Sequence, residues 1–113
     1  MKLKGTIVLE SLNDDRILNE VEVSHFRVTK EETSDERWHM FTVRADEGTV
    51  ARLAGFLKPG WYAHFWNGDD VVAVFQGQTF NFKYSDRSTW KEAVEYGKSL
   101  GIPEEQLDFL IEE

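Results

Sequence analysis

Cysteine is absent from this sequence. Its absence excludes disulfide bonds, thiolate nucleophiles and zinc sites built from cysteine, and it fits a reducing compartment, so we expect a cytoplasmic protein. Residues 1–4 enter an alternating pattern and not the apolar stretch of a signal peptide, so no signal peptide is predicted. No apolar run approaches the roughly 20 residues of a membrane-spanning helix, and we therefore expect no membrane partner.

Basic residues are few: 13 Lys and Arg stand against 21 Asp and Glu, and the formal net charge is -8 at pH 7. The Lys and Arg residues stand singly among acids, and no basic patch is visible that could follow a phosphate backbone. A negative field of this kind repels nucleic acids and anionic membranes. We therefore predict that the protein does not bind nucleic acid.

Motifs of the common catalytic and nucleotide-binding sites are also missing. No serine stands in a Gly-x-Ser-x-Gly context, and neither Gly-x-Gly-x-x-Gly nor the P-loop pattern occurs. The histidines His25, His39 and His64 share no HxH or HExxH spacing, so no metal site is predicted; His25 and His39 are instead expected almost opposite each other on paired strands. We predict no cofactor and no catalytic residue, and an enzyme is the less favoured interpretation.

Apolar and aromatic residues are plentiful. They make up 41% and 13% of the 113 residues, which is enough for one hydrophobic core. The length is that of one ordinary domain. We predict a single α+β domain that spans residues 1–113.

Six stretches of strand-like sequence, most of them alternating, predict β-strands. They cover residues 3–10, 21–30, 38–45, 61–66, 71–75 and 79–84. In the second stretch the apolar residues change phase, which predicts a β-bulge near Ser24 and His25.

Two helices are predicted between these strands. A short helical turn follows Ser11 or Asn13 as its N-cap, and a longer helix with an apolar stripe follows Asp46. The first 66 residues then have the order β-α-β-β-α-β. This order predicts a ferredoxin-like βαββαβ antiparallel sheet.

The rest of the chain extends this unit. The last two predicted strands form a C-terminal β-hairpin extension, and two terminal helices follow. The first begins at Thr89, which can form a capping box with Glu92, and the second begins near Pro103. The apolar side of the second helix is predicted to hold Leu107, Leu110 and Ile111.

The segment 58–68 carries the densest aromatic sequence of the chain. Side chains alternate along a strand, so the strand in this segment has two distinct faces. One face, which we call face A, takes Tyr62, His64 and Trp66, and continues across the hairpins through residues 71, 73, 75, 80, 82 and 84. The opposite face, face B, takes Trp61, Ala63 and Phe65. So much aromatic surface is out of place in solvent, so we expect both faces to be covered, and the sequence leaves open which one meets the helices.

Face A supplies the candidate ligand-binding site. Its predicted residues are Tyr62, His64, Trp66, Phe75 and Phe80. His64 is the best chemical candidate, because an imidazole among rings stays neutral and can act as a base or donate a hydrogen bond to a ligand. The structural alternative is a core histidine bonded to Tyr62 or to a backbone carbonyl.

Two segments of the chain have a familiar pattern. Residues 60–65 are Gly-Trp-Tyr-Ala-His-Phe, and residues 101–108 carry the motif Gly-Ile-Pro-Glu-x-Gln-Leu-Asp. With them, the chain resembles a family of small prokaryotic proteins whose function is uncharacterised. The resemblance spans most of the chain, is densest after residue 58, and implies no activity.

Three hypotheses follow for the role of face A. The favoured one is a non-enzymatic binding or self-association module that uses this face, most simply as a homodimer. The alternative is a small-molecule-binding protein or small enzyme with a pocket around His64. In the third, the C-terminal helices fold back over face A and the arrangement is purely structural.

Overall fold

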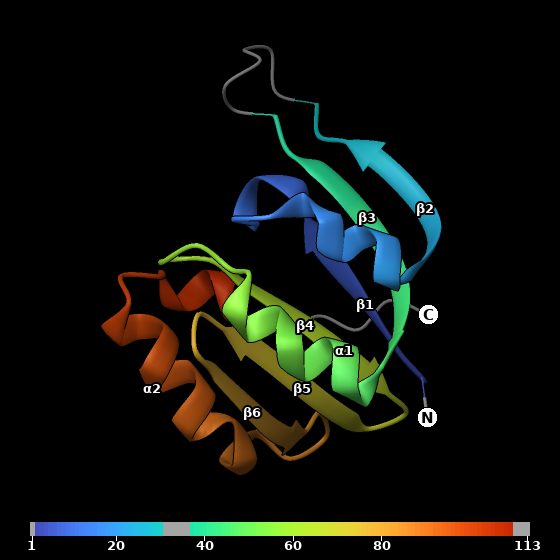
Figure 1. Ribbon diagram of the computed structural model, residues 1–113. Coiled ribbons are helices and arrows are strands. Elements are labelled where there is room, and N and C mark those ends of the chain that lie inside the picture. The colour runs from blue at the N-terminus through green and yellow to red at the C-terminus, as the bar shows by residue number, and fades with distance from the viewer. Residues whose placement is uncertain (1, 31–36, 110–113) are drawn as a thin grey trace.

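The computed structural model describes residues 2–30 and 37–109. Within them, six strands form one antiparallel sheet in the order β2-β3-β1-β4-β5-β6 (Figure 1). The strands are β1 (Lys2–Val8), β2 (Glu22–Val28), β3 (His39–Asp46), β4 (Tyr62–Asn67), β5 (Asp70–Phe75) and β6 (Gln78–Lys83). Each predicted strand is confirmed, with ends that differ by up to a few residues.

Short helical segments connect and follow the strands. They are the 3-10 helices η1 (Leu9–Ser11), η2 (Asp15–Glu20), η4 (Leu53–Gly55), η5 (Arg87–Trp90) and η6 (Glu104–Gln106), and the α-helices α1 (Glu47–Arg52) and α2 (Lys91–Ser99). Sheet and helices together give an α+β fold. Among the described residues, no helix is both long and apolar enough to cross a membrane.

The register of the sheet follows the predicted alternation. β1 lies between β3 and β4, so Thr6 is opposite both Thr42 and His64. β4, β5 and β6 form two successive hairpins. In their turns Gly68 and Gly77 have φ values of 59° and 77°, the left-handed region that glycine enters without steric cost. The hairpins therefore keep the predicted residues of face A on one side.

β2 and β6 are the two edge strands of the sheet, and β2 pairs only with β3 among the described strands. The register shifts between Val23 and His25, which confirms the predicted bulge. His25 lies opposite Thr42, and Val28 lies opposite His39. The prediction that His25 and His39 lie almost opposite each other is therefore wrong, because the register places His39 opposite Val28, three residues after His25.

Face B is covered by η2, α1 and η4 over β1, β3 and β4. Their apolar side chains and those of the strands form one buried cluster, core B. Its buried members are Leu3, Ile7, Leu12, Ile17, Val43, Ala45, Val50, Leu53, Leu57, Ala63, Phe65 and Val74. The helix that carries part of this core begins as predicted, since the Asp46 carboxylate accepts a hydrogen bond from the Thr49 N–H at 2.8 Å.

Face A is covered by α2 and the segment that follows it, over β4, β5 and β6 (Figure 1). The buried cluster on this side, core A, consists of Trp66, Val71, Ala73, Phe75, Phe82, Trp90, Ala93, Ile102, Leu107 and Phe109. Helices therefore meet both faces, and β4 buries side chains on both, as predicted. Each face is covered over only part of its width.

The first helical turn begins later than predicted. Asp14 is the N-cap of η2, and its carboxylate accepts from the Arg16 N–H at 3.1 Å. The predicted caps have other partners: the hydroxyl of Ser11 donates to a carbonyl of β1, and the amide of Asn13 donates to the Leu57 carbonyl at 3.2 Å. Both residues therefore tie the loop to its surroundings and do not start the helix.

The capping box predicted at Thr89 and Glu92 is also wrong. Asp86 caps the preceding turn η5 by accepting from the Ser88 N–H at 3.1 Å. The Thr89 hydroxyl instead accepts from the Lys83 N–H at 3.0 Å, which attaches this turn to the end of β6. The helix α2 then continues directly from the turn.

The predicted terminal helix is not formed over its described part. After Pro103 the chain makes only the 3-10 turn η6, and Leu107 then has φ and ψ of -99° and 46°, which are not helical. Leu107 and Phe109 both enter core A, and this requirement bends the chain away from a helix. The predicted contacts of Leu110 and Ile111 lie outside the described residues.

Gly5 provides a test of the close approach of β1 and β4. A Cβ atom at Gly5 would lie 2.4 Å from Cδ2 of Phe65 and 2.6 Å from the backbone oxygen of His64. We expect Gly5→Ala to lower the free energy of unfolding by about 3 kcal/mol, the upper part of the range for overpacking, because the backbone oxygen cannot move aside.

Gly55→Ala is the matched control for Gly5→Ala. A Cβ atom there meets no other atom within 4 Å, so we expect a near-zero change. Urea unfolding curves of both variants and the wild type measure the difference, and equal effects of the two substitutions would show that β1 and β4 do not approach as described.

Candidate functional site

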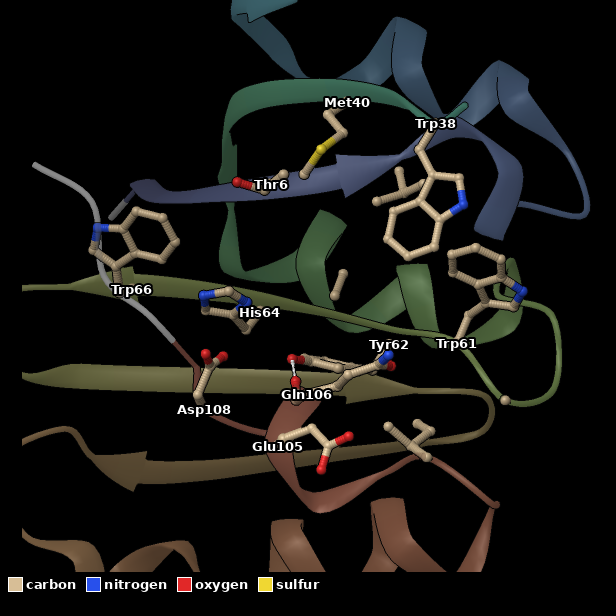
Figure 2. A pocket seen from close by; sticks show the side chains of 14 residues that line it. Thr6, Trp38, Met40, Trp61, Tyr62, His64, Trp66, Glu105, Gln106 and Asp108 are labelled. Atoms are coloured by element: carbon tan, nitrogen blue, oxygen red, sulfur yellow. Dashed lines mark hydrogen bonds between the residues drawn. The ribbon is translucent and has the colours of Figure 1, made fainter. Parts of the chain in front are cut away.

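A groove lies on the part of face A that α2 leaves uncovered (Figure 2). Its volume is about 540 Å³. One wall consists of Thr6 and Val8 from β1 and Met40 from β3, which point to this side because of the strand alternation. β4 and the residue before it form the floor, and residues 102–108 form the other wall. We call this site the face A groove.

The floor of the groove is a row of rings. Tyr62, His64 and Trp66 are alternate residues of β4, and Figure 2 shows them side by side along the strand. The ring centroids of His64 lie 6.2 Å from Tyr62 and 5.3 Å from Trp66. The imidazole is therefore the polar group in the middle of an aromatic surface.

Two tryptophans close one end of the groove. The rings of Trp38 and Trp61 meet edge to face with centroids 5.1 Å apart (Figure 2). Trp61 was predicted on face B, and this is wrong. β4 begins only at Tyr62, and Trp61 belongs to the preceding turn, where its N–H donates to the Lys58 carbonyl at 3.3 Å. Strand alternation therefore does not decide its direction.

The second wall is held to the floor by one hydrogen bond. The hydroxyl of Tyr62 donates to the backbone carbonyl of Gln106 (Figure 2). Burial of the phenol, with a smaller contribution from the Asp108 carboxylate, raises the pKa of Tyr62 well above its ordinary value. Tyr62 therefore stays protonated and keeps donating across the physiological range.

Phe109 anchors the same wall from behind. Its side chain is completely buried. Its ring centroid lies 5.4 Å from Tyr62, 6.0 Å from His64, 5.0 Å from Phe82 and 5.4 Å from Trp90. This ring fills the space between the floor of the groove and core A, so the wall cannot lie closer to β1 or move farther from it without losing these contacts.

The predicted site residues divide into two sets. Tyr62, His64 and Trp66 line the groove. Phe75 and Phe80 do not: Phe75 is fully buried in core A, and Phe80 is half-buried against Phe75 with ring centroids 5.8 Å apart. They share face A with the groove, but α2 covers their part of the face.

Eleven of the fourteen lining residues were not predicted as site residues. Those that contribute a ring, a sulfur atom or a charge are Trp38, Met40, Trp61, Glu105 and Asp108. Trp38 and Met40 are alternate residues of the predicted strand 38–45, but the sequence did not show that this strand lies across β1 from β4. The two acids had no usable signal, because their segment was predicted as a helix.

Charge distinguishes this groove from a second one on the opposite face. Glu105 and Asp108 line the face A groove, and among the described residues neither forms an ion pair and no Lys or Arg lines the groove. The second groove, of about 540 Å³ beside β6, contains Glu47 and Asp70, and Lys83 pairs with the Asp70 carboxylate. The face A groove, with two carboxylates and no Lys or Arg, is therefore the more negative of the two.

Metal ligation finds no support in the described ranges. They contain no group of three or more His, Cys, Asp or Glu side chains that could hold a metal ion. The ring Nδ1 of His39 is instead 2.6 Å from the Glu10 carboxylate, which also accepts from the His39 N–H. Burial alone would raise the pKa of Glu10, but these hydrogen bonds outweigh it and lower the pKa.

Comparison of the chain with protein-family models, with curated proteins and with solved structures gives no match. The resemblance to small prokaryotic proteins therefore stays a prediction. What the site can do is inferred from its geometry: a groove with aromatic surfaces, a central imidazole and two carboxylates can enclose an apolar body and contact a polar or charged group.

Tyr62→Phe tests the bond that holds the second wall. We expect the free energy of unfolding to fall by about 1 kcal/mol, because the Gln106 carbonyl loses its donor. Tyr96→Phe is the matched control: its hydroxyl also reaches a backbone carbonyl, that of Gln76, but at 3.5 Å, so its removal should change stability little. Thermal unfolding of both variants gives the comparison.

The pH dependence of stability provides a second readout of the same substitution. The pKa of Tyr62 is higher in the folded protein than the value of about 10 in an unfolded chain. Its contribution is therefore complete below about pH 10 and is lost as the pH rises above that value. This loss should be smaller in Tyr62→Phe than in wild type, and identical alkaline profiles would contradict the assignment.

Proposed function

We propose that this protein is a small non-enzymatic binding module and that its site is the face A groove. The observation that carries the proposal is the concentration of aromatic rings there: three of the four tryptophans line the groove, together with Tyr62. A volume of about 540 Å³ falls within the range of small-molecule sites. We propose a small molecule as the ligand.

The composition of the lining supports binding in preference to catalysis. Rings provide contact area and stacking, and among the described lining residues the hydroxyl groups belong to Thr6 and Tyr62 only. Tyr62 is already used as a donor to the second wall. A small enzyme that uses His64 with a groove carboxylate as an acid–base pair is the alternative, and turnover of a bound ligand would establish it.

We also propose that the fold is a variant of the ferredoxin-like sheet. The adjacency of the first four strands, β2-β3-β1-β4, and their antiparallel pairing support this relation. The variant replaces the first helix by the 3-10 helix η2 and adds β5 and β6 beside β4. This addition creates the sheet surface that α2 covers. A cytoplasmic location and the lack of nucleic-acid binding remain predictions.

The indole N–H signals in two-dimensional NMR spectra test the proposed site directly. A library of soluble aromatic fragments should contain compounds that shift the signals of Trp38, Trp61 and Trp66. The signal of Trp90 should stay in place, because its ring is buried in core A and its indole N–H donates a hydrogen bond to the Lys83 carbonyl at 2.8 Å. A library in which no compound moves the three groove signals would overturn the proposal.

A blocking substitution completes this test. Thr6 points into the groove from the middle of β1, so Thr6→Tyr should fill it and weaken binding by about tenfold or more, equivalent to about 1.4 kcal/mol. Thr79→Tyr makes the same change on face B of β6 and should leave binding unchanged. Equal loss in both variants would point to a general effect on the sheet.

The edge strand β2 favours a second function, self-association. Its side chains Val23, Phe26 and Val28 are 46%, 53% and 41% exposed. Exposed apolar side chains on an edge strand favour pairing with another strand. We propose that a second copy of the chain pairs at this edge to form a homodimer.

Sedimentation analysis tests the dimer across the micromolar range. Wild type should associate with increasing concentration, and Phe26→Lys should shift it to the monomer, because it places a charge in the apolar patch. His25→Lys is the control, since His25 is an exposed neighbour of Phe26 that does not belong to the patch of Val23, Phe26 and Val28. A wild-type monomer at the highest concentration would refute the dimer.

A further inference from the structure

The two carboxylates of the face A groove are placed at its rim. Glu105 and Asp108 both come from the second wall and are exposed to solvent. In Figure 2 they lie across the groove from Thr6 and Met40 and on the same side as Gln106. A ligand that lies on the rings of β4 therefore passes beside two negative charges.

The rings themselves attract positive charge. The face of an indole or phenol ring carries negative potential and binds a cation within about 6 Å. The protein already uses this contact on the same side of the sheet, where the Arg87 guanidinium lies 4.1 Å from the centroid of the Trp90 ring. The rings of the groove offer the same surface to a ligand.

The protein's own cations are kept out of the groove. Lys4 lies opposite Trp66 in the sheet and Arg44 lies opposite Lys4, but neither lines the groove. Lys98, the basic residue of α2 nearest in sequence to the second wall, pairs with Glu104 at 3.7 Å. Arg27 lies beside the first wall, with its guanidinium 3.7 Å from the sulfur of Met40, but it does not line the groove. Among the described residues, no Lys or Arg lines the groove or pairs with Glu105 or Asp108.

We propose that the ligand of the face A groove is a small organic cation, an apolar or aromatic body that carries an ammonium group. The body lies on Tyr62 and the tryptophans, and the ammonium group contacts Glu105 and Asp108. This inference rests on the proposed binding function and specifies the ligand class. The net charge of -8 adds a long-range attraction for cations.

Three probes with the same ring separate charge from shape. Phenethylamine is a cation, phenethyl alcohol is neutral and hydrocinnamate is an anion at neutral pH. We expect phenethylamine to bind about tenfold more tightly than the alcohol at low salt, with hydrocinnamate weakest. Shifts of the indole signals of Trp38, Trp61 and Trp66 measure the three affinities.

The salt dependence provides an independent readout. Raising the ionic strength from about 0.01 M to about 1 M shortens the Debye length from about 30 Å to about 3 Å, so the preference for the amine should shrink. Binding of phenethyl alcohol should change little over the same range. A preference that persists unchanged at high salt would contradict the role of the exposed carboxylates.

The double variant Glu105→Gln/Asp108→Asn removes both rim charges while keeping the shape of the side chains. We expect it to bind phenethylamine and phenethyl alcohol almost equally. The control Glu92→Gln/Glu95→Gln makes the same change in net charge with exposed residues of α2 that neither line the groove nor form an ion pair among the described residues, and it should keep the preference. Thermal unfolding of both variants checks that the fold is intact.

The outcomes separate this inference from the binding function. If all three probes bind with equal affinity, or if hydrocinnamate binds best, the proposal of a cationic ligand is wrong and the groove remains a binding site. If none of them, and no fragment of the library, shifts the groove signals, both are wrong. If the double variant and its control lose the preference equally, the overall charge and not the rim selects the ligand, and the inference fails.

Discussion

The burial of one phenylalanine determines where the end of the described chain lies, and the groove depends on it. Phe109 has a φ of 45°, a left-handed conformation that costs an ordinary residue about 1–2 kcal/mol. Full burial of such a side chain contributes about 1.5–3 kcal/mol, and its edge-to-face contacts with Tyr62 and Trp90 add to this. Burial therefore offsets the strain. The contact also fixes the second wall above β4, and without that wall face A would be an open sheet beside β1.

Two glycines allow the cores on the two faces to approach the backbone closely. Gly5 lets the ring of Phe65 lie directly on β1 in core B, because a Cβ there would be 2.4 Å from that ring. Gly97 has the same role in core A, where a Cβ would be 2.8 Å from Leu107. The helical segments that cover the two faces are offset from each other. Those on face B extend over β1, β3 and β4, and those on face A extend over β4, β5 and β6. This offset leaves one uncovered stretch on each face, and this is why each face carries a groove.

Alternation was the reliable signal in this sequence, and it is a local property. It predicted the strands, the bulge in β2 and the sharing of face A by Tyr62, His64 and Trp66. It could not assign Trp61, which precedes the strand, or place Trp38 next to it, because that contact joins segments far apart in the chain. The helical prediction after Pro103 failed for a related reason. Its spacing of apolar residues fits a helix, but tertiary burial of Leu107 and Phe109 outweighs that preference.

The rings at the end of the groove contribute less to the core than their size allows. Trp38 is 39% exposed and Trp61 is half-buried, although an isolated fold would gain more by burying both. Their edge-to-face contact holds the two rings together at the end of the groove and does not fill the groove. Thr6, in the middle of β1, is likewise too small to close the gap. The lining therefore preserves an open aromatic surface next to two carboxylates that form no ion pair among the described residues, an arrangement that core packing alone does not require.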